Sequence, residues 1–188
     1  MLSHLELARA LERVIRRAQL PYAVSQGFSP HMRIGFGAAL PVGVGGSCEI
    51  FDVVLTRYIA PEKALSALQA ATVDDLPMKA CEYIEPSAKA ASVAFPRGTY
   101  CAVFSQAIDE LRVPQTITVI RKRKEKVLQV ADYLVGSLQL DETTCTFELE
   151  AHEAGSLRAD VFLQACLDYT GLTQNVSVLS VTRVALGA

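Results

Sequence analysis

The chain has 188 residues, of which 51% are hydrophobic and 20% are charged, and its formal net charge is −2. This length suits one large domain or two small ones. No apolar run approaches the ~18 residues of a membrane-spanning helix, and no signal-peptide pattern opens the sequence, so we expect a cytoplasmic protein with no membrane partner. The cysteines include no C-x-x-C pair and predict reduced thiols in the core. They are Cys48, Cys81, Cys101, Cys145 and Cys166.

The first part of the sequence alternates helix and strand signals. Leu7, Leu11 and Ile15 recur at helical intervals and predict a helix over residues 3–19, which Pro21 ends. Pro61 suits the first position of a second helix, over residues 61–71. Short strands are expected at residues 22–25, 32–38, 48–55 and 78–84, with residues 41–47 as a hairpin loop.

A stretch rich in Pro, Ser, Ala and Lys, residues 86–98, is typical of a linker. We therefore expect one unit over residues 1–85 and another over residues 99–188. In the latter, the patterns predict strands at residues 99–104, 116–123, 144–150 and 176–184, and helices at residues 128–138 and 159–169, the last capped by Ser156.

The order of these elements favours an α+β fold. Short connections between strands imply antiparallel pairing, and the mixture predicts two ferredoxin-like units (βαββαβ) with helices packed on one face of each sheet. A ferredoxin-like unit opens with a strand, whereas Met1 lies almost at a helix start. We expect that the first sheet lacks its opening strand and has an open edge, or that the native start lies upstream.

Arginines recur at three- and four-residue spacing in the first expected helix, so they line one stripe of it. Arginine binds phosphate and carboxylate through two parallel hydrogen bonds, and the stripe therefore predicts an anion site, with RNA as the ligand. The alternative is a solvated helix face with ion pairs to Glu6 and Glu12. The residues predicted to bind the anion are Arg9, Arg13, Arg16, Arg17, Phe28, His31 and Arg33.

Four groups near the start of the chain are able to transfer protons: His4, His31, Glu49 and Asp52. Glu49 and Asp52 lie at odd spacing on one expected strand, so their side chains point to opposite faces unless a bulge intervenes. Spacings typical of metal ligands, such as H-x-x-x-H, do not occur, and we expect no metal and no cofactor. A non-catalytic protein is the expectation, and an enzyme with these acid–base groups is the alternative.

A second basic run, residues 121–126, contains five positive charges and one negative charge. It predicts a secondary anion-binding patch. The alternative is a solvated hairpin tip that protects a sheet edge from pairing. The basic residues of this run are Arg121, Lys122, Arg123, Lys124 and Lys126.

Three motifs carry a resemblance to a known family: Ser3-His4-Leu5-Glu6 before the spaced arginines, Gly27-Phe28-Ser29-Pro30, and the Glu49-x-x-Asp52 pair. The sequence resembles the domain of unknown function that is attached to, or encoded beside, cobalamin-binding radical SAM proteins. Glu6 stands where aspartate is usual and Ser29 where asparagine is usual, and both changes keep capping or turn chemistry.

The carboxyl-terminal half matches this family more loosely, through Gly155-Ser156-Leu157-Arg158 and Thr182-Arg183. The resemblance implies an accessory domain that is fused to a radical SAM partner or works with one. The RNA-directed role follows from the basic helix and not from the resemblance. A protein-interaction module, binding its partner through the exposed edge of the first sheet, is the remaining alternative.

Overall fold

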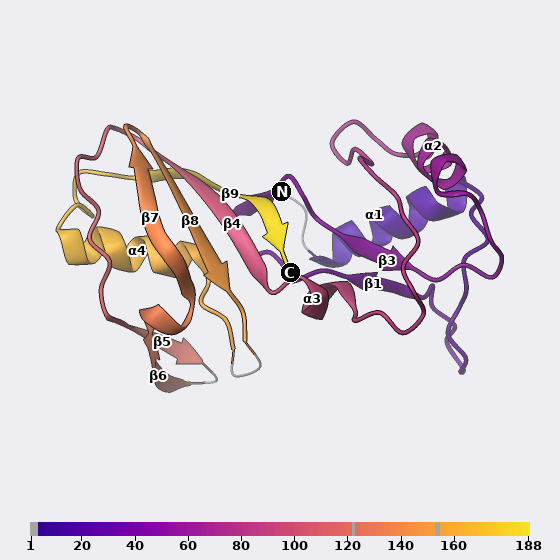
Figure 1. Cartoon of the computed structure of the whole chain (residues 1–188), viewed down its shortest axis with the longest axis horizontal. Coiled ribbons are helices and arrows are strands. Elements are labelled where there is room, and N and C mark those ends of the chain that lie inside the picture. Colours follow the sequence, from indigo (N-terminus) through magenta and orange to yellow (C-terminus); the bar gives the residue numbers. More distant parts are fainter. Residues whose placement is uncertain (1–3, 122, 153–154) are drawn as a thin grey trace. The chain divides into compact units, whose positions relative to one another are not determined.

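The computed structural model describes residues 4–121, 123–152 and 155–188 (Figure 1). Two compact units make up the chain, one of Met1–Ala39 with Ile50–Ala94 and one of Leu40–Glu49 with Phe95–Ala188. We call them the first and the second unit. The predicted division at residues 86–98 leaves residues 40–49 in the first unit, whereas the structure groups them with the second.

Two helices form one side of the core of the first unit. In α1 (His4–Arg17), Leu11, Val14 and Ile15 are buried at helical spacing. In α2 (Pro61–Ala71), proline occupies the first turn as predicted, and the buried residues are Ala64, Leu68 and Ala71. Residues 1–3 lie outside the described residues, and so does the predicted cap at Ser3.

A small antiparallel sheet completes this core. Strand β1 (Ile34–Phe36) pairs with β3 (Phe51–Val53), and two isolated bridges, Tyr22 with Leu55 and Val24 with Met32, extend the sheet. Helix α3 (Ala91–Ala94) lies beside β1. The prediction of a strand at residues 78–84 is wrong, because this segment forms no ladder with a neighbouring strand; Met78 and Cys81 instead pack their side chains against the core.

The second unit is built on a five-stranded sheet in the order β2-β9-β4-β8-β7. All pairs are antiparallel except β2 with β9, which is parallel. One helix, α4 (Ala159–Thr170), covers a face of this sheet and buries Phe162, Leu163 and Cys166 (Figure 1). The strands are β2 (Val44–Gly46), β4 (Arg97–Phe104), β7 (Leu134–Asp141), β8 (Thr144–Glu150) and β9 (Val178–Gly187).

The predicted hairpin loop at residues 41–47 therefore contains β2, an edge strand. A hairpin, β5 (Thr116–Arg121) with β6 (Lys124–Gln129), lies in the connection between β4 and β7. A ferredoxin-like unit has a helix at this place, while the antiparallel order β9-β4-β8-β7 has the split βαβ arrangement of that fold. The α+β class is confirmed, and ferredoxin-like units stay a prediction.

The prediction of a helix at residues 128–138 is wrong. Those residues form the end of β6, a 3₁₀ turn η1 (Val130–Asp132) and the start of β7. Leu128 and Val130 are buried two residues apart, which is strand spacing, and Gly136 has a positive φ of 69°. The predicted cap at Ser156 is also replaced, since α4 begins after Arg158 without a side-chain cap.

Candidate functional site

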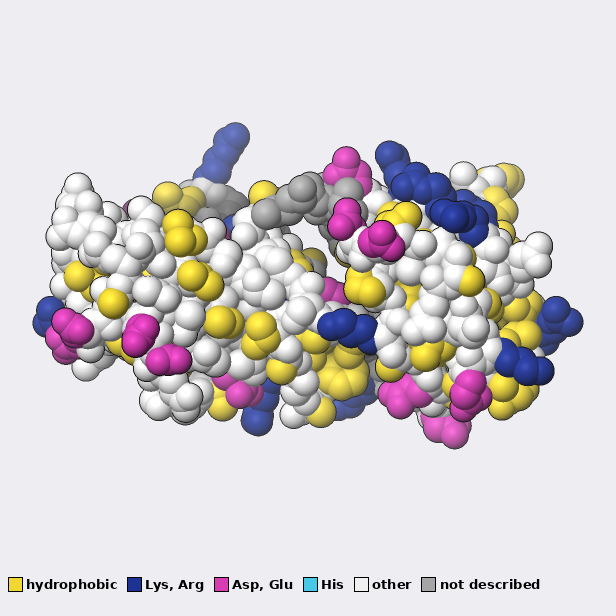
Figure 2. Space-filling model, turned by 90° about the horizontal axis from the view of Figure 1, so that it is seen from above, with side chains coloured by type: hydrophobic (Ala, Val, Ile, Leu, Met, Phe, Trp, Pro, Cys, Tyr) yellow, Lys and Arg dark blue, Asp and Glu magenta, His cyan; other side chains and the backbone are white. Residues whose placement is uncertain are grey.

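The arginine stripe lies on the exposed face of α1. Arg16 is paired with Glu12 at 3.0 Å, and a hydrogen bond to Tyr22, followed by the charge of Glu12, raises the pKa of Arg16. Arg9, Arg13 and Arg17 are exposed, and no carboxylate of the described residues lies within ion-pair distance of them. In the right half of Figure 2, which shows the first unit, Lys and Arg side chains gather near the upper edge, and others lie at the right end. An intrahelical ion pair thus engages one arginine of the four among the described residues, while both the anion site and the solvated helix face stay open for the others.

The carboxyl-terminal end of the stripe borders a shallow hollow. The hollow has a volume of about 340 Å³. It is lined by Arg17 at the end of α1, by Ala18 in the turn that follows, and by alanines of α2. The small alanine side chains leave this hollow between the two helices. The alanines are Ala67, Ala70 and Ala71.

A closed turn presents the Gly-Phe-Ser-Pro motif. The amide of His31 donates to Oγ of Ser25 at 3.0 Å, and the amide of Ser25 donates to the carbonyl of His31 at 2.8 Å. Gly27 has a φ of +144°, which side-chain-bearing residues rarely adopt. Phe28 is fully exposed at this turn. The two hydrogen bonds thus fix the base of the turn, and the ring of Phe28 is exposed to solvent.

His31 and Arg33 are exposed on either side of Met32, which is buried in the core with Val14 and Ile15. Side chains alternate along an extended segment, so His31 and Arg33 point away from the core that α1 covers. Among the described residues, no hydrogen bond or ion pair joins either of them to α1. The anion site therefore rests on the helix, and its extension to these two residues stays a prediction.

The two predicted carboxylates lie in different units. Glu49 forms a bidentate ion pair with Arg183 of β9, with Nε to Oε1 at 2.9 Å and Nη2 to Oε2 as the second contact. The side chain of Arg183 is 3% exposed and that of Glu49 is 32% exposed. Asp52, in β3, accepts a hydrogen bond from the amide of Ala91 at 3.1 Å. Both carboxylates therefore already have structural partners.

The surroundings of Arg183 fit the ion pair closely. Burial acts to lower the pKa of Arg183, but hydrogen bonds and charge from Glu49, with a further hydrogen bond to Tyr100, outweigh it and raise the pKa. The carbonyl of Arg183 accepts three hydrogen bonds from the loop after β2. The donors are the amide of Ser47 at 3.0 Å, the hydroxyl of Ser47 at 3.3 Å and the thiol of Cys48 at 3.6 Å. The loop after β2 is thus fastened to β9 by both main chain and side chains.

For the histidines, the structure places His4 at the start of α1 and His31 at the exposed turn. The side chain of His4 lies outside what is described. Acid–base chemistry by these groups stays a prediction. No group of three or more metal-ligating side chains occurs among the described residues. None of the helices described is long and apolar enough to cross a bilayer.

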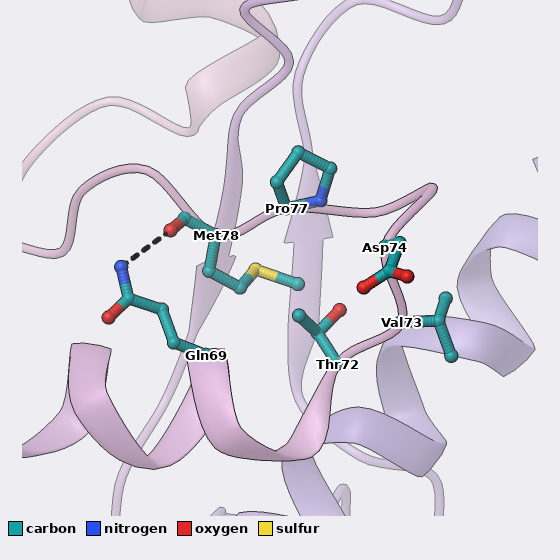
Figure 3. Close-up of a pocket in the computed structure, with 6 residues that line it drawn as sticks. All are labelled: Gln69, Thr72, Val73, Asp74, Pro77 and Met78. Atoms are coloured by element: carbon teal, nitrogen blue, oxygen red, sulfur yellow. Dashed lines mark hydrogen bonds between the residues drawn. The ribbon is translucent and has the colours of Figure 1, made fainter.

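A hollow of about 320 Å³ lies at the carboxyl-terminal end of α2 (Figure 3). Nε2 of Gln69 donates to the carbonyl of Met78 at 3.0 Å, and the hydroxyl of Thr72 donates to the carbonyl of Leu76 at 2.6 Å. These polar groups hold the turn that follows α2 and are engaged with the main chain. The remaining lining residues are Val73, Asp74 and Pro77.

The second basic run lies at the tip of the β5–β6 hairpin, where Arg123 and Lys124 are exposed. Lys126 lies further along β6 and is exposed as well. Lys122 and the side chain of Arg121 lie outside the described part of the chain. The hairpin confirms that the predicted strand ends in the basic run. Anion binding by this run stays a prediction.

Sequence reasoning missed two features. The pairing of Arg183 with Glu49 joins residues 134 positions apart, and the only signal was the loose match of Thr182-Arg183 to the resembling family. The rings of Tyr58 and Tyr83 stack at 5.1 Å, although 25 positions separate them. Neither contact follows from local periodicity, because each depends on how distant segments pack.

The fold and the arginine face describe an α+β protein with an exposed basic helix. Residues 1–159 match the family model described as an uncharacterized protein conserved in bacteria (DUF2344), and the chain belongs to that family. The match ends at the first residue of α4 and so includes α1 and Glu49 but not Arg183. No curated protein and no solved structure matches the chain.

Proposed function

We propose that the protein is a non-catalytic cytoplasmic accessory module that binds RNA through the exposed arginines of α1. The observation that carries this proposal is the set Arg9, Arg13 and Arg17, three exposed guanidinium groups of a 14-residue helix without a carboxylate partner among the described residues. Since no carboxylate of the described residues engages them, these three groups are available to an anionic ligand.

Electrostatics favour phosphate as the ligand of this face. The net charge of the chain is −2, so attraction must come from a local group of cations and not from the whole molecule. Arginine presents a planar fork of donors that fits phosphate oxygens. Neutralising phosphates releases counterions, so binding weakens as salt rises.

The test is fluorescence anisotropy with labelled bulk tRNA across a salt series, from about 50 to 200 mM. The Arg9→Gln/Arg13→Gln/Arg17→Gln variant is expected to bind more weakly. Its log–log salt slope is expected to fall by about 2 to 3, because each phosphate that an arginine neutralises contributes ~0.7–0.9 to that slope. Arg33→Ala, measured separately, tests the predicted extension to the sheet.

A control variant that removes two positive charges elsewhere in the chain tests how far net charge alone affects binding. Arg112 and Arg158 are exposed in the second unit and are paired with Glu110 and Asp160. The Arg112→Gln/Arg158→Gln variant is expected to bind tRNA as the unaltered protein does. Equal tRNA binding by the unaltered protein and the α1 variant would refute the proposal.

The radical SAM partner enters the proposal from the sequence resemblance alone. In this scheme the helix α1 holds RNA while the partner protein carries out the chemistry. Purification of the protein with a radical SAM protein, retained after nuclease treatment, supports the partnership. Recovery of the partner only when RNA is intact indicates that the nucleic acid bridges the two proteins.

A further inference from the structure

The β5–β6 hairpin is a two-stranded ribbon that ends in the second basic run (Figure 1). Ile117 and Leu128 face each other across the two strands and are buried in the core of the second unit, and Val119 packs against that core. This inner face fixes the base of the hairpin.

The outer face of the ribbon is apolar near the tip. Ile120 is 79% exposed and Val127 is 57% exposed. Ile120 pairs with Glu125 and Val127 pairs with Thr118, so alternation places all four side chains on the face opposite the core. This face also carries Glu125, whereas Lys124 pairs with Arg121 and lies on the other face, so the exposed apolar side chains and Lys124 do not share a face.

The turn of the hairpin is unusual in its residue type. Arg121 pairs with Lys124, so only two residues connect the strands. Arg123, one of them, has a φ of 63°. Two-residue hairpin turns favour Gly, Asn or Asp at such positions, because a β-carbon is strained there. A basic residue therefore occupies a place where glycine relieves strain, and strained residues of this kind cluster at functional sites.

We propose that Arg123 and Lys124, at the tip of this hairpin, contact the phosphates of RNA. This inference rests on the proposed function and adds a second contact, in the second unit, to that of α1. Arg123 and Lys124 are adjacent exposed cations, which suits the phosphate oxygens of RNA.

The experiment measures the backbone strain at Arg123 as a change in melting temperature. Arg123→Gly removes both the charge and the strain, so the variant is expected to melt about 2–4 °C higher yet bind tRNA about threefold to tenfold more weakly at low salt, with a salt slope lower by about 1. Lys124→Gln removes a neighbouring charge without altering the turn and is expected to weaken binding as well.

Glu142 provides the matched control, because it has a φ of 49° between β7 and β8 of the same unit. Glu142→Gly is expected to raise the melting temperature similarly and leave tRNA affinity undiminished. The inference is overturned if Arg123→Gly and Lys124→Gln bind tRNA as the unaltered protein does. It is also overturned if these variants lose binding only to anionic phospholipid vesicles.

The α1 variant separates this inference from the proposed function. Loss of affinity in the ribbon variants alone supports the ribbon and refutes the role of α1. Loss in the α1 variant alone refutes the ribbon and supports α1. A lower melting temperature for Arg123→Gly removes the strain argument and counts against the inference.

Discussion

Arg183 and Glu49 form a bidentate ion pair at the end of the parallel pairing of β2 with β9. Arg183 is almost fully buried, whereas about a third of the Glu49 side chain is exposed. A buried guanidinium group that loses its carboxylate stays uncompensated, since the protein interior solvates it poorly. The pair is therefore expected to matter more for the attachment of residues 40–49 than the short strand β2 itself.

Glu49→Gln is expected to lower the free energy of unfolding by about 2–4 kcal/mol, somewhat less than the loss of a fully buried partner because Glu49 is partly solvated. Urea denaturation measures this change. Glu150→Gln is the control, because it breaks the more exposed Arg97–Glu150 pair and is expected to cost less than about 1 kcal/mol. Similar values for both variants would show that the buried pair contributes no more than a surface pair.

A substitution at Gly46 tests the same ion pair, because a side chain added there would meet Glu49. A Cβ at Gly46 would lie 2.5 Å from Oε1 of Glu49, which the ion pair with Arg183 prevents from moving freely. Gly46→Ala is expected to cost about 1–3 kcal/mol in the unaltered protein and close to nothing in Glu49→Ala, where the clashing atoms are gone. Gly45→Ala, which meets only an ordinary contact at 3.4 Å, serves as the control. Additive effects in the double variant would contradict this geometry.

Because the thiols of Cys145 and Cys166 are buried, we expect the folded protein to lose stability at high pH. Burial raises the pKa of Cys145 and of Cys166 from 9.0 to about 12. Neutral thiols favour the folded state below about pH 9, and this stability is lost as the pH rises towards 12, because the unfolded chain ionises first. Between about pH 8 and about pH 10.5 each thiol is expected to contribute a fall of about 2 kcal/mol.

Urea denaturation at the two pH values measures this fall. The Cys145→Ala/Cys166→Ala variant is expected to be less stable at neutral pH, because it leaves cavities, but to lose less stability on going to alkaline pH. An equal loss in the variant and the unaltered protein would assign the alkaline effect to other groups.

Phe28→Ser is expected to leave the melting temperature unchanged, because the ring is fully exposed and packs against nothing in the described residues. If the ring stacks on an RNA base, the same variant weakens tRNA binding by about 1–3 kcal/mol without altering the salt slope. Ser25→Ala, which removes the hydroxyl that accepts from His31, is expected to loosen the turn and lower the melting temperature slightly. Melting curves and anisotropy together separate the two effects.

Local sequence patterns were sufficient for several elements. Helix α2 and strand β8 begin and end at the predicted residues, because Pro61 starts the helix and the alternation at residues 144–150 is regular. The α+β class followed from such elements. The predicted helix at residues 128–138 failed because its apolar residues are dense enough to suit either spacing, and the packing of the second core selected strands.

Long-range contacts limited the prediction of the site. The arginine stripe of α1 followed from helical spacing, but its exposure did not, because spacing places side chains on one face without showing what that face meets. The partner of Glu49 did not, because Arg183 reaches it only through the parallel pairing of β2 with β9. Residues 41–47, rich in glycine, gave a loop signal, and a three-residue edge strand has too few side chains to produce an alternating pattern.

Residues 40–49 also bear on how the chain folds during synthesis. They precede β9 by well over a hundred residues, with 134 positions between Glu49 and Arg183. At ~5–20 residues per second, a ribosome takes roughly 7–27 s to add that many residues. Throughout this interval β2 lacks β9, its partner strand, and for the later part of it the first unit, which ends at Ala94, is already complete. Residues 40–49 therefore wait for several seconds, between segments of a finished unit, before they can join their own sheet.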